Sequence, residues 1–354
     1  MSDVAAFADV GIVAIGRNEG ERAKTCLKSA IAGLGGAAGV VYVDSGSTDG
    51  SPDFARSLGV AVVDLDPSEP FTAARARNAG LAGVPADLTY VQFLDADCEL
   101  VEGWLATAVA TLDAEEELAG VAGRRRERHP DATLFNKLCD MEWDTPIGET
   151  VAVGGDAMFR RTVLNAVGGF DPTLIAGEEP EMCLRMRELG FTLRRLDAEM
   201  TIHDAAMTSW RQWWIRNRRA GHAYAETLDR HPPTGAREVR SNYLLGLGIS
   251  GAVTATPLAG LMLVIGCVSD RNARPTMLRA TAILALGPVG VGVVCWWVGS
   301  RIRRYRIARG DSSIDATLYS RLVLLGKLPQ SVGQLRYRWN SLRNKRSALI
   351  EYKD

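Results

Sequence analysis

A short apolar run that ends in two aspartates is the feature that most constrains this chain. Tyr90 to Leu94 is apolar or aromatic apart from Gln92, and Asp95 and Asp97 follow with one residue between them. Such a run, too short for a helix, predicts a buried parallel strand, and open α/β sheets bind ligands at the carboxyl ends of their strands. Two carboxylates there repel each other unless a cation lies close by, so the pair predicts either a Mg²⁺ or Mn²⁺ site or an ordinary solvated turn.

Three more apolar runs precede this one, and helical segments separate them. We expect strands at 10–15, 40–43 and 60–65, and a helix that opens with Ser51 as N-cap and Pro52 at its first position. Strand and helix in alternation predict an α/β head: a mostly parallel, Rossmann-like sheet with flanking helices.

The side chains at the strand exits suit a nucleotide. Asn18 and Glu19 follow the first strand, and Asp44 opens the glycine- and serine-rich DSGSTDGS after the second. An ordinary turn or helix N-terminus would use the same residues. No GxGxxG fingerprint is present, so a dinucleotide site is not indicated. Arg77, in ARARNAG, is available to a phosphate group.

The order VAIGRNEGER, VYVDSGSTDGS, ARNAG and FLDADCEL resembles the nucleotide-sugar-binding half of the family 2 glycosyltransferases, whose fold is called GT-A. The resemblance covers about residues 10–225, and four motifs in this order and spacing are specific together although each is weak alone. It implies an α/β catalytic head that binds a nucleoside diphosphate sugar.

The resemblance also implies roles for the strand-exit residues. Asp44 would bind the nucleobase, with Asn18 and Glu19 near the base or ribose. Asp95 would hold the ribose or phosphate side of the donor. Asp97, in the DxD motif, would be the principal ligand of Mn²⁺ or Mg²⁺.

The second half of the head would contact the acceptor. The basic run GRRRERHP at 123–130 indicates either a solvated face or part of an anionic acceptor groove. Gly154 and Gly155 indicate a close backbone approach to a ligand, and the resemblance implies that Asp156 contacts the donor sugar. The sequence GGFD at 168–171 is typical of a helix C-terminus.

Two adjacent glutamates are the candidate acid–base groups. Glu178 and Glu179 precede Pro180, which fits the first turn of a helix, and capping acids alone would account for them. The family carries its catalytic base here in a Glu-Asp pair, so Glu179 falls on the base position and Glu178 beside the donor. Glu in place of Asp keeps the carboxylate but adds a methylene, and a base must come within hydrogen-bond distance of the acceptor hydroxyl.

His203 ends a strand-like segment, and the resemblance implies that it is a further metal ligand. A lone histidine is more often structural, but a neutral imidazole suits Mn²⁺. The Trp- and Arg-rich segment 210–219 predicts either an amphipathic helix or a mobile lid in which Arg216 meets the diphosphate. Gln212 and Arg216 lack the spacing of the Gln-x-x-Arg-Trp motif, which argues against a processive synthase.

Two uncharged stretches follow the head, at 243–268 and 280–300. At about 1.5 Å per residue, each is long enough to cross a bilayer core of about 30 Å. They predict a transmembrane helical hairpin within 231–310; a re-entrant hairpin that never crosses is the rival topology. An interfacial amphipathic helix and a basic tail are expected over 311–354.

The charges are divided along the chain. Residues 231–354 carry 18 Lys and Arg against 6 Asp and Glu, whereas the rest carries 23 against 36. A basic, apolar rear suits anionic membrane lipids, and its long apolar runs argue against nucleic acid. The six cysteines show no CxxC spacing, and no signal peptide is visible. We therefore expect a cytoplasmic catalytic domain at the inner (plasma) membrane.

These observations predict a catalytic domain over 1–230, with a nucleotide-sugar half at about 10–100 and an acceptor half at 101–230. The expected activity is inverting, metal-dependent transfer of a sugar from a nucleoside diphosphate sugar, by default a UDP-sugar, to a hydroxyl of a lipid-linked glycan, as in polysaccharide biosynthesis. One alternative is a nucleotidyltransferase of sugar phosphates, for which GRNEGER is a poor phosphate loop. The other is a non-catalytic, nucleotide-binding membrane scaffold.

Overall fold

The computed structural model describes residues 7–231, 237–268 and 274–345. The chain divides into two compact units on either side of the bond between Ser209 and Trp210. We call the described residues up to Ser209 unit 1 and those from Trp210 onward unit 2.

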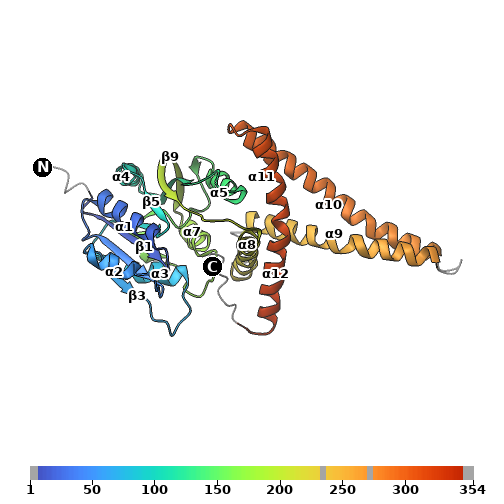
Figure 1. Ribbon diagram of the computed structural model, residues 1–354, viewed down its shortest axis with the longest axis horizontal. Coiled ribbons are helices and arrows are strands. Elements are labelled where there is room, and N and C mark those ends of the chain that lie inside the picture. Colours follow the sequence, from blue (N-terminus) through green and yellow to red (C-terminus); the bar gives the residue numbers. More distant parts are fainter. Residues whose placement is uncertain (1–6, 232–236, 269–273, 346–354) are drawn as a thin grey trace. The chain divides into compact units, whose positions relative to one another are not determined.

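Unit 1 alternates strands and helices, as the sequence predicts (Figure 1). Its elements are β1 (Val10–Gly16), α1 (Glu21–Leu34), β2 (Val40–Asp44), α2 (Ser51–Ser57), β3 (Ala61–Asp64), α3 (Ala73–Gly83), β4 (Tyr90–Asp95), β5 (Cys98–Leu100), α4 (Trp104–Ala114), β6 (Leu118–Glu127), α5 (Leu134–Trp143), β7 (Gly148–Glu149), β8 (Met158–Arg160), α6 (Arg161–Ala166), α7 (Glu178–Glu188) and β9 (Thr192–His203).

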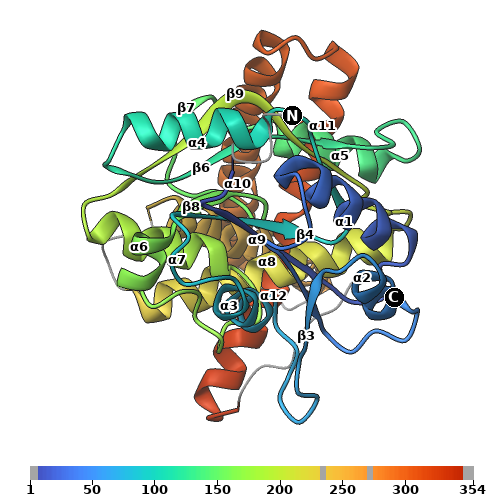
Figure 2. The same cartoon turned by 90° about the vertical axis from the view of Figure 1, so that its left-hand side faces the viewer.

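One sheet runs through unit 1, with helices packed around it (Figure 2). Its strand order is β3-β2-β1-β4-β8-β6-β9-β5, and β7 pairs with β9. The first four strands are parallel, as predicted, and β6 is parallel to β9, whereas β8 runs antiparallel to both β4 and β6. Because β1, β2 and β4 are neighbours, their carboxyl ends bring the Asn18, Asp44 and Asp95 segments to one edge of the sheet.

The central strands are buried because their apolar runs leave no polar face. Nearly every residue of β1 and β4 is buried, and α3 packs directly on β1 and β2. A Cβ at Gly80 would lie 2.2 Å from Val13 Cγ1, so only glycine permits this approach. Arg77 lies one helical turn before Gly80, and the close packing therefore fixes where its side chain begins.

One local prediction is wrong. Ser51 is not an N-cap, since Gly50 caps α2 in the left-handed conformation (φ 81°) and Ser51 is the first helical residue. The basic run at 123–130 is a solvated face only in part, because 123–127 belong to β6 in the sheet, whereas Arg126 and Arg128 are exposed. Arg124 is buried there, and its guanidinium pairs with Asp140 at 2.9 Å. The acceptor-groove alternative for this run stays a prediction.

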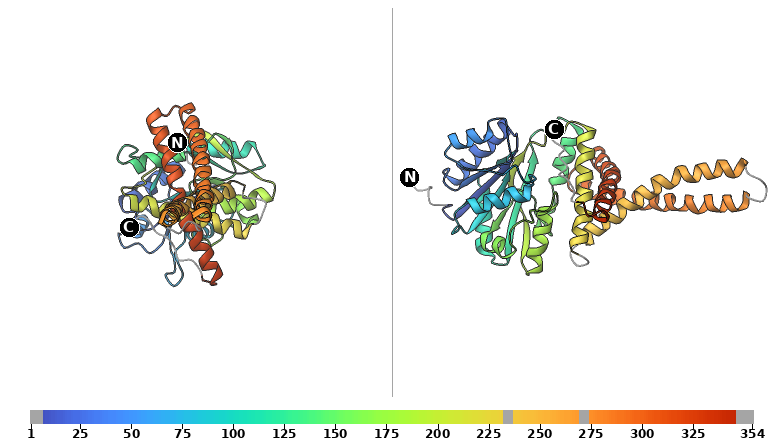
Figure 3. Two further views of the ribbon diagram at one scale, coloured as in Figure 1. Left: turned by 90° about the vertical axis from the view of Figure 1, so that its right-hand side faces the viewer. Right: turned by 90° about the horizontal axis from the view of Figure 1, so that it is seen from below.

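Unit 2 consists, in its described residues, of helices. They are α8 (Trp210–Arg230), α9 (Arg237–Val268), α10 (Arg274–Ala308), α11 (Ser313–Leu325) and α12 (Lys327–Leu342). The helix that the sequence analysis placed at the end of the head, α8, thus belongs to this unit. Figure 3 shows α9 and α10 side by side as an antiparallel pair, so the expected helical hairpin is present.

The structure does not support the two expected membrane spans. Among the residues it describes, no helix combines the length and the apolar character needed to cross a bilayer.

Candidate functional site

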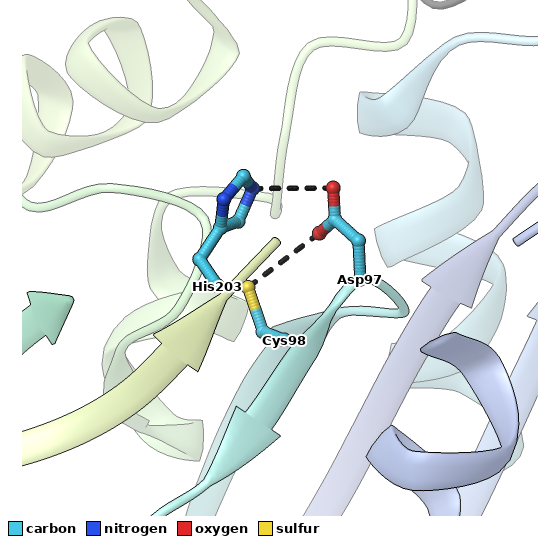
Figure 4. A group of neighbouring side chains, drawn as sticks. All are labelled: Asp97, Cys98 and His203. Carbon is cyan, nitrogen blue, oxygen red and sulfur yellow. Dashed lines mark hydrogen bonds and ion pairs between the residues drawn. The ribbon is translucent and has the colours of Figure 1, made fainter. Parts of the chain in front are cut away.

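Three side chains that could hold a metal ion converge at the end of β4. Asp97, Cys98 and His203 are all buried, and one ligand atom from each lies within 4.8 Å of the others (Figure 4). His203 Nε2 lies 3.1 Å from Asp97 Oδ2, and the Cys98 thiol donates to Asp97 Oδ1 over 3.5 Å. We call these residues the Asp97 cluster.

The pairing of β5 with β9 creates this cluster. Cys98 lies opposite His203 in the antiparallel register, so residues 105 positions apart in sequence become direct neighbours. The backbone NH of Asp204 donates to the Asp97 carbonyl at 3.0 Å and closes the end of the ladder. The structure thus places Asp97 and His203 next to each other, and their role as metal ligands stays a prediction.

His203 is held from its other side by Glu127 and Trp143. Its Nδ1 lies 3.8 Å from Glu127 Oε2, and its ring meets Trp143 edge to face at 4.4 Å. Burial lowers the pKa of His203, but the carboxylates of Asp97 and Glu127 outweigh that effect and raise it above its ordinary value. The imidazole therefore lies between two carboxylates, and these contacts fix the orientation of its ring.

Glu127 is itself held firmly. Its Oε2 accepts from the NH of Ala205 at 3.0 Å, and its Oε1 accepts from Asn136 Nδ2 at 2.9 Å. Burial raises the pKa of Glu127, but the nearby His203 imidazole and these hydrogen bonds lower it below the ordinary value. Glu127 is therefore a fixed anion behind His203.

A single arginine connects Asp95 with the two glutamates of α7. Arg77 is 2% exposed; its Nη2 lies 2.8 Å from Asp95 Oδ1, and its Nη1 lies 3.0 Å from both Glu178 Oε1 and Glu179 Oε1. We call these four residues the Arg77 network. The prediction that Arg77 is available to a phosphate is not supported, because its terminal nitrogens already serve carboxylates.

Glu179 has the electrostatics of a general base. Burial, followed by repulsion from Glu178, raises its pKa to about 7, and the attraction of Arg77 offsets only part of this. A carboxylate with a pKa near neutrality accepts a proton far more readily than an ordinary glutamate, and it still ionises at physiological pH. Helix α7 begins at Glu178, so both acids lie at the helix N-terminus, as predicted.

Asp156 and Arg125 brace the same region. Asp156 is fully buried, and its Oδ1 accepts from the NH of Asp95 at 3.0 Å. Its Oδ2 accepts from Thr201 Oγ1 at 2.9 Å and lies 2.8 Å from Arg125 Nη2. The expected contact of Asp156 with the donor sugar stays a prediction; what the structure shows is a carboxylate that fixes the backbone at Asp95.

Gly155 approaches this network and not an open ligand site. A Cβ added there would lie 2.2 Å from Arg77 Nη2 and 3.1 Å from the Asp95 carboxylate oxygens, whereas one at Gly154 would meet nothing within 4 Å. Of the two glycines, only Gly155 is required for close packing. In the structure the close backbone approach at Gly155 is to an ion pair of the protein, and the approach to a ligand stays a prediction.

The loops after β1 and β2 are tied together. Asn18 Oδ1 accepts from the NH of Thr48 at 2.8 Å, and the NH of Asn18 donates to Ser47 Oγ at 2.9 Å. Asp44 is buried and accepts from the NH of Ser47 at 2.8 Å, while Glu19 pairs with Arg22 at 2.7 Å. These bonds pre-form one loop pair at the sheet edge, and the nucleotide contacts expected of Asn18, Glu19 and Asp44 stay predictions.

Arg216 lies on α8 in unit 2 and is not part of either group in unit 1. Its expected contact with the diphosphate stays a prediction.

The sequence analysis did not identify Arg125, Glu127 or Trp143. Arg125 and Glu127 belong to the basic run that was interpreted as a surface or an acceptor groove, and Trp143 ends α5 with no motif around it. Arg125 lies over the Trp143 ring at 5.5 Å, and that ring contacts His203. The sequence did hold one signal for buried ion pairs: a glutamate lies among these arginines, and two more acidic residues follow at 140 and 144.

Comparisons with known proteins find similarity to glycosyltransferases. Residues 12–168 match the family described as glycosyl transferase family 2. A pre-mycofactocin glycosyltransferase of Mycobacterium tuberculosis is 29% identical over 248 residues, which cover 66% of this chain and 52% of that protein. Glycosyltransferase AglE of Haloferax volcanii is 28% identical over 44% of this chain and 52% of its own length. Over residues 12–168 the chain is therefore similar to family 2 glycosyltransferases.

Solved structures of glycosyltransferases share the fold. The mannosyltransferase PcManGT from Pyrobaculum calidifontis, in complex with GDP-Man and Mn²⁺, aligns over 94% of this chain and 87% of its own, with 18% identity and a TM-score of 0.54. GalNAc-T7 with UDP, GalNAc and Mn²⁺ aligns over 67% of this chain and 50% of its own, with 16% identity and a TM-score of 0.51. The chain spans about half the length of the curated relatives it matches. Glu179 and His203 lie beyond the segment that matches family 2, so their assignment depends on the geometry above.

Proposed function

We propose that this protein is a family 2 glycosyltransferase that moves a sugar from a nucleoside diphosphate sugar to an acceptor hydroxyl with inversion at the anomeric carbon. The observation that carries the proposal is the connection between the two groups of unit 1: Asp97 lies two residues from Asp95, and Asp95 shares Arg77 with Glu179. A donor-binding group and a base of raised pKa are thus held by one buried cation. Inversion in a single displacement needs one base and no protein nucleophile. A single glutamate with a raised pKa fits this requirement.

Asp97 and His203 would hold the divalent ion, Mn²⁺ or Mg²⁺. Their facing oxygen and nitrogen atoms suit Mn²⁺, whereas the Cys98 thiol is a soft ligand whose pKa is raised well above its ordinary value by burial. When bound, the ion supplies Lewis-acid stabilisation of the departing nucleoside diphosphate. Glu127 keeps the imidazole in orientation, and Asp156 fixes the backbone of Asp95.

Glu179 would remove the proton from the acceptor hydroxyl as its oxygen attacks the anomeric carbon. Arg77 pairs with Glu178 and Asp95 as well as with Glu179. Its positive charge therefore only partly opposes protonation of the Glu179 carboxylate. A UDP-sugar is the default donor, and a GDP-sugar is the alternative. PcManGT in complex with GDP-Man and GalNAc-T7 with UDP support both nucleotides as candidates.

The acceptor in this proposal is a lipid-linked glycan at the inner (plasma) membrane, with unit 1 in the cytoplasm. The support is the basic composition of the rear of the chain, which would place the enzyme where such acceptors lie. One matched relative is named an O-antigen chain rhamnosyltransferase, WbaN of Salmonella anatum, which is 26% identical over 167 residues. Polysaccharide assembly is therefore the proposed setting.

A donor panel tests the activity. UDP- and GDP-sugars with Mn²⁺ should raise the melting temperature of the wild type, and Asp97→Ala should abolish that rise. With a matching donor and a polyprenyl-diphosphate-linked sugar, the wild type should release nucleoside diphosphate. Glu179→Gln should lose transfer by at least about a hundredfold while it still binds donor.

Glu188→Gln is the matched control, since Glu188 is exposed at the other end of α7. Release of pyrophosphate instead of nucleoside diphosphate would indicate a nucleotidyltransferase. Donor binding with no turnover in the wild type would indicate a scaffold.

A further inference from the structure

Helix α12 presents its polar side inward and its apolar side outward. Its buried polar or charged side chains recur at 327, 330, 331 and 334, which is one helical face; Pro329 and Gly333 are also buried. Its large exposed apolar positions recur at 332, 335, 339 and 342, which is another face. The buried set is Lys327, Gln330, Ser331 and Gln334, and the exposed set is Val332, Leu335, Trp339 and Leu342.

This is the reverse of a helix in a water-soluble protein, which buries its apolar stripe. Single exposed apolar residues are normal, but a stripe over three turns of one helix is not. The exposed side chains are also large: Trp339 is 55% exposed and Leu342 is 81% exposed. We call Val332, Leu335, Trp339 and Leu342 the α12 stripe.

The hairpin helices show the same exposure in the residues whose side chains the structure describes. Trp296 is 72% exposed and Val289 is 65% exposed on α10, and Leu261 is 57% exposed on α9. Other large exposed apolar residues of the pair are Leu244, Val253, Ile265, Val293, Val294 and Trp297. The apolar exterior therefore extends over several helices of unit 2.

Beside buried apolar side chains such as Trp213 and Leu322, the helices of unit 2 contact each other through small and polar residues. A Cβ at Gly221 of α8 would lie 1.8 Å from the Gln330 carbonyl oxygen, and one at Gly333 of α12 would lie 2.0 Å from that of Arg218. Lys327 Nζ donates to Asn242 Oδ1 at 2.6 Å, which joins α12 to α9. Close glycine contacts and interhelical polar bonds are how helices associate when the surrounding solvent is apolar.

Arginines flank the apolar surface and stack on its tryptophans. Arg343 lies 4.0 Å from the ring of Trp339, and Arg301 lies 4.8 Å from that of Trp297. Residues 210–347 carry 22 Lys and Arg against 6 Asp and Glu. Tryptophan beside arginine is typical of the headgroup layer, and a strong positive excess suits anionic lipids.

We propose that unit 2 docks on an anionic lipid bilayer, with the α12 stripe and the exposed tryptophans of α10 in the acyl layer and the flanking arginines among the headgroups. Docking of this kind does not require a helix that crosses the bilayer. A second copy of the chain is the less suitable partner, because two such surfaces would bring two large positive charges together. The proposal is independent of the transfer reaction in unit 1.

Vesicle flotation of the full chain tests the proposal. The wild type should float with phosphatidylcholine vesicles that contain phosphatidylglycerol, and brominated acyl chains should quench its tryptophan fluorescence. The variant Leu335→Gln/Trp339→Gln/Leu342→Gln should bind at least about tenfold more weakly, because it removes most of the stripe. All three side chains are exposed, so circular dichroism should show unchanged helix content.

The matched control is Leu189→Gln in unit 1, where Leu189 is 56% exposed against 57% for Leu335. It should leave vesicle binding unchanged. Arg336→Gln/Arg343→Gln should weaken binding to the anionic vesicles by about fivefold per arginine and leave binding to pure phosphatidylcholine unchanged.

Three results would overturn the proposal. The first is a wild type that does not float with either vesicle. The second is equal loss of binding in the stripe variant and in Leu189→Gln. The third is a lipid-free dimer that the stripe variant converts to monomers, which would assign the surface to a second copy.

Discussion

Arg77 is almost completely enclosed and balances three carboxylates from two elements, β4 and α7. Its charge holds the pKa of Asp95 below its ordinary value against the effect of burial, and it limits the rise in the pKa of Glu179. Two acids that lie close together and share this arginine therefore differ in protonation at neutral pH. Asp95 stays an anion suited to the donor side, and Glu179 is left near its midpoint at neutral pH.

The pKa of Glu179 predicts the pH dependence of transfer. A base works only when deprotonated, so kcat/KM should be lost as pH falls through about 7 and be fully present above it. Glu178→Gln removes the neighbouring negative charge, so the midpoint of this acidic limb should move down by about one pH unit. Steady-state rates between pH 5 and 9 measure both. An acidic limb near the ordinary glutamate value of 4.5 would contradict the assignment of Glu179 as the base.

Gly155 and Gly154 form a matched pair of test positions. Alanine at 155 places a methyl carbon against Arg77 and Asp95, so Gly155→Ala should lower the free energy of unfolding by about 1–3 kcal/mol and weaken donor binding. Gly154→Ala meets no neighbour and should change stability by at most about 0.5 kcal/mol. Denaturant unfolding and donor titration of both variants test the contrast, and equal effects would refute it.

At the scale of elements, the strands that are continuous apolar runs were predictable, whereas β6 and β8 were not. β1, β2 and β4 are continuous apolar runs with turn residues after them, which a local reading detects. β8 has three residues, and it is a strand only because β4 and β6 lie on both sides of it. β6 carries three consecutive arginines, which composition alone assigns to solvent.

The contact between α8 and α12 predicts a second stability test. Gly221→Ala directs a methyl group into the backbone of α12, so the two helices must separate and unit 2 should lose about 1–3 kcal/mol of stability. Gly251→Ala on α9 meets nothing within 4 Å and should be neutral or stabilising by up to about 1 kcal/mol, because alanine favours the helix. Hydrogen exchange of α8 and α12 reports the effect. A Gly221→Ala variant with unchanged protection would show that the helices do not pack this closely.

At the scale of the whole molecule, charge and hydropathy predicted two parts of different character. The acidic front folds as the α/β unit, and the basic rear folds as helices. The candidate site was predicted in part: Asp97, His203, Glu178 and Glu179 were named from motifs, and the structure brings them into two adjoining groups. Their supports, Arg125 and Glu127, were not identifiable, because burial of a charged side chain depends on partners distant in sequence.

The shared guanidinium has a consequence for anyone who exchanges parts between related enzymes. The acids that surround it come from α7 and from the end of β4, whereas the cation comes from α3. If α7 were transferred to a related enzyme without α3, its two glutamates would lack the positive charge of Arg77. Chimeras should therefore be cut so that residues 77 and 178–179 keep the same parent.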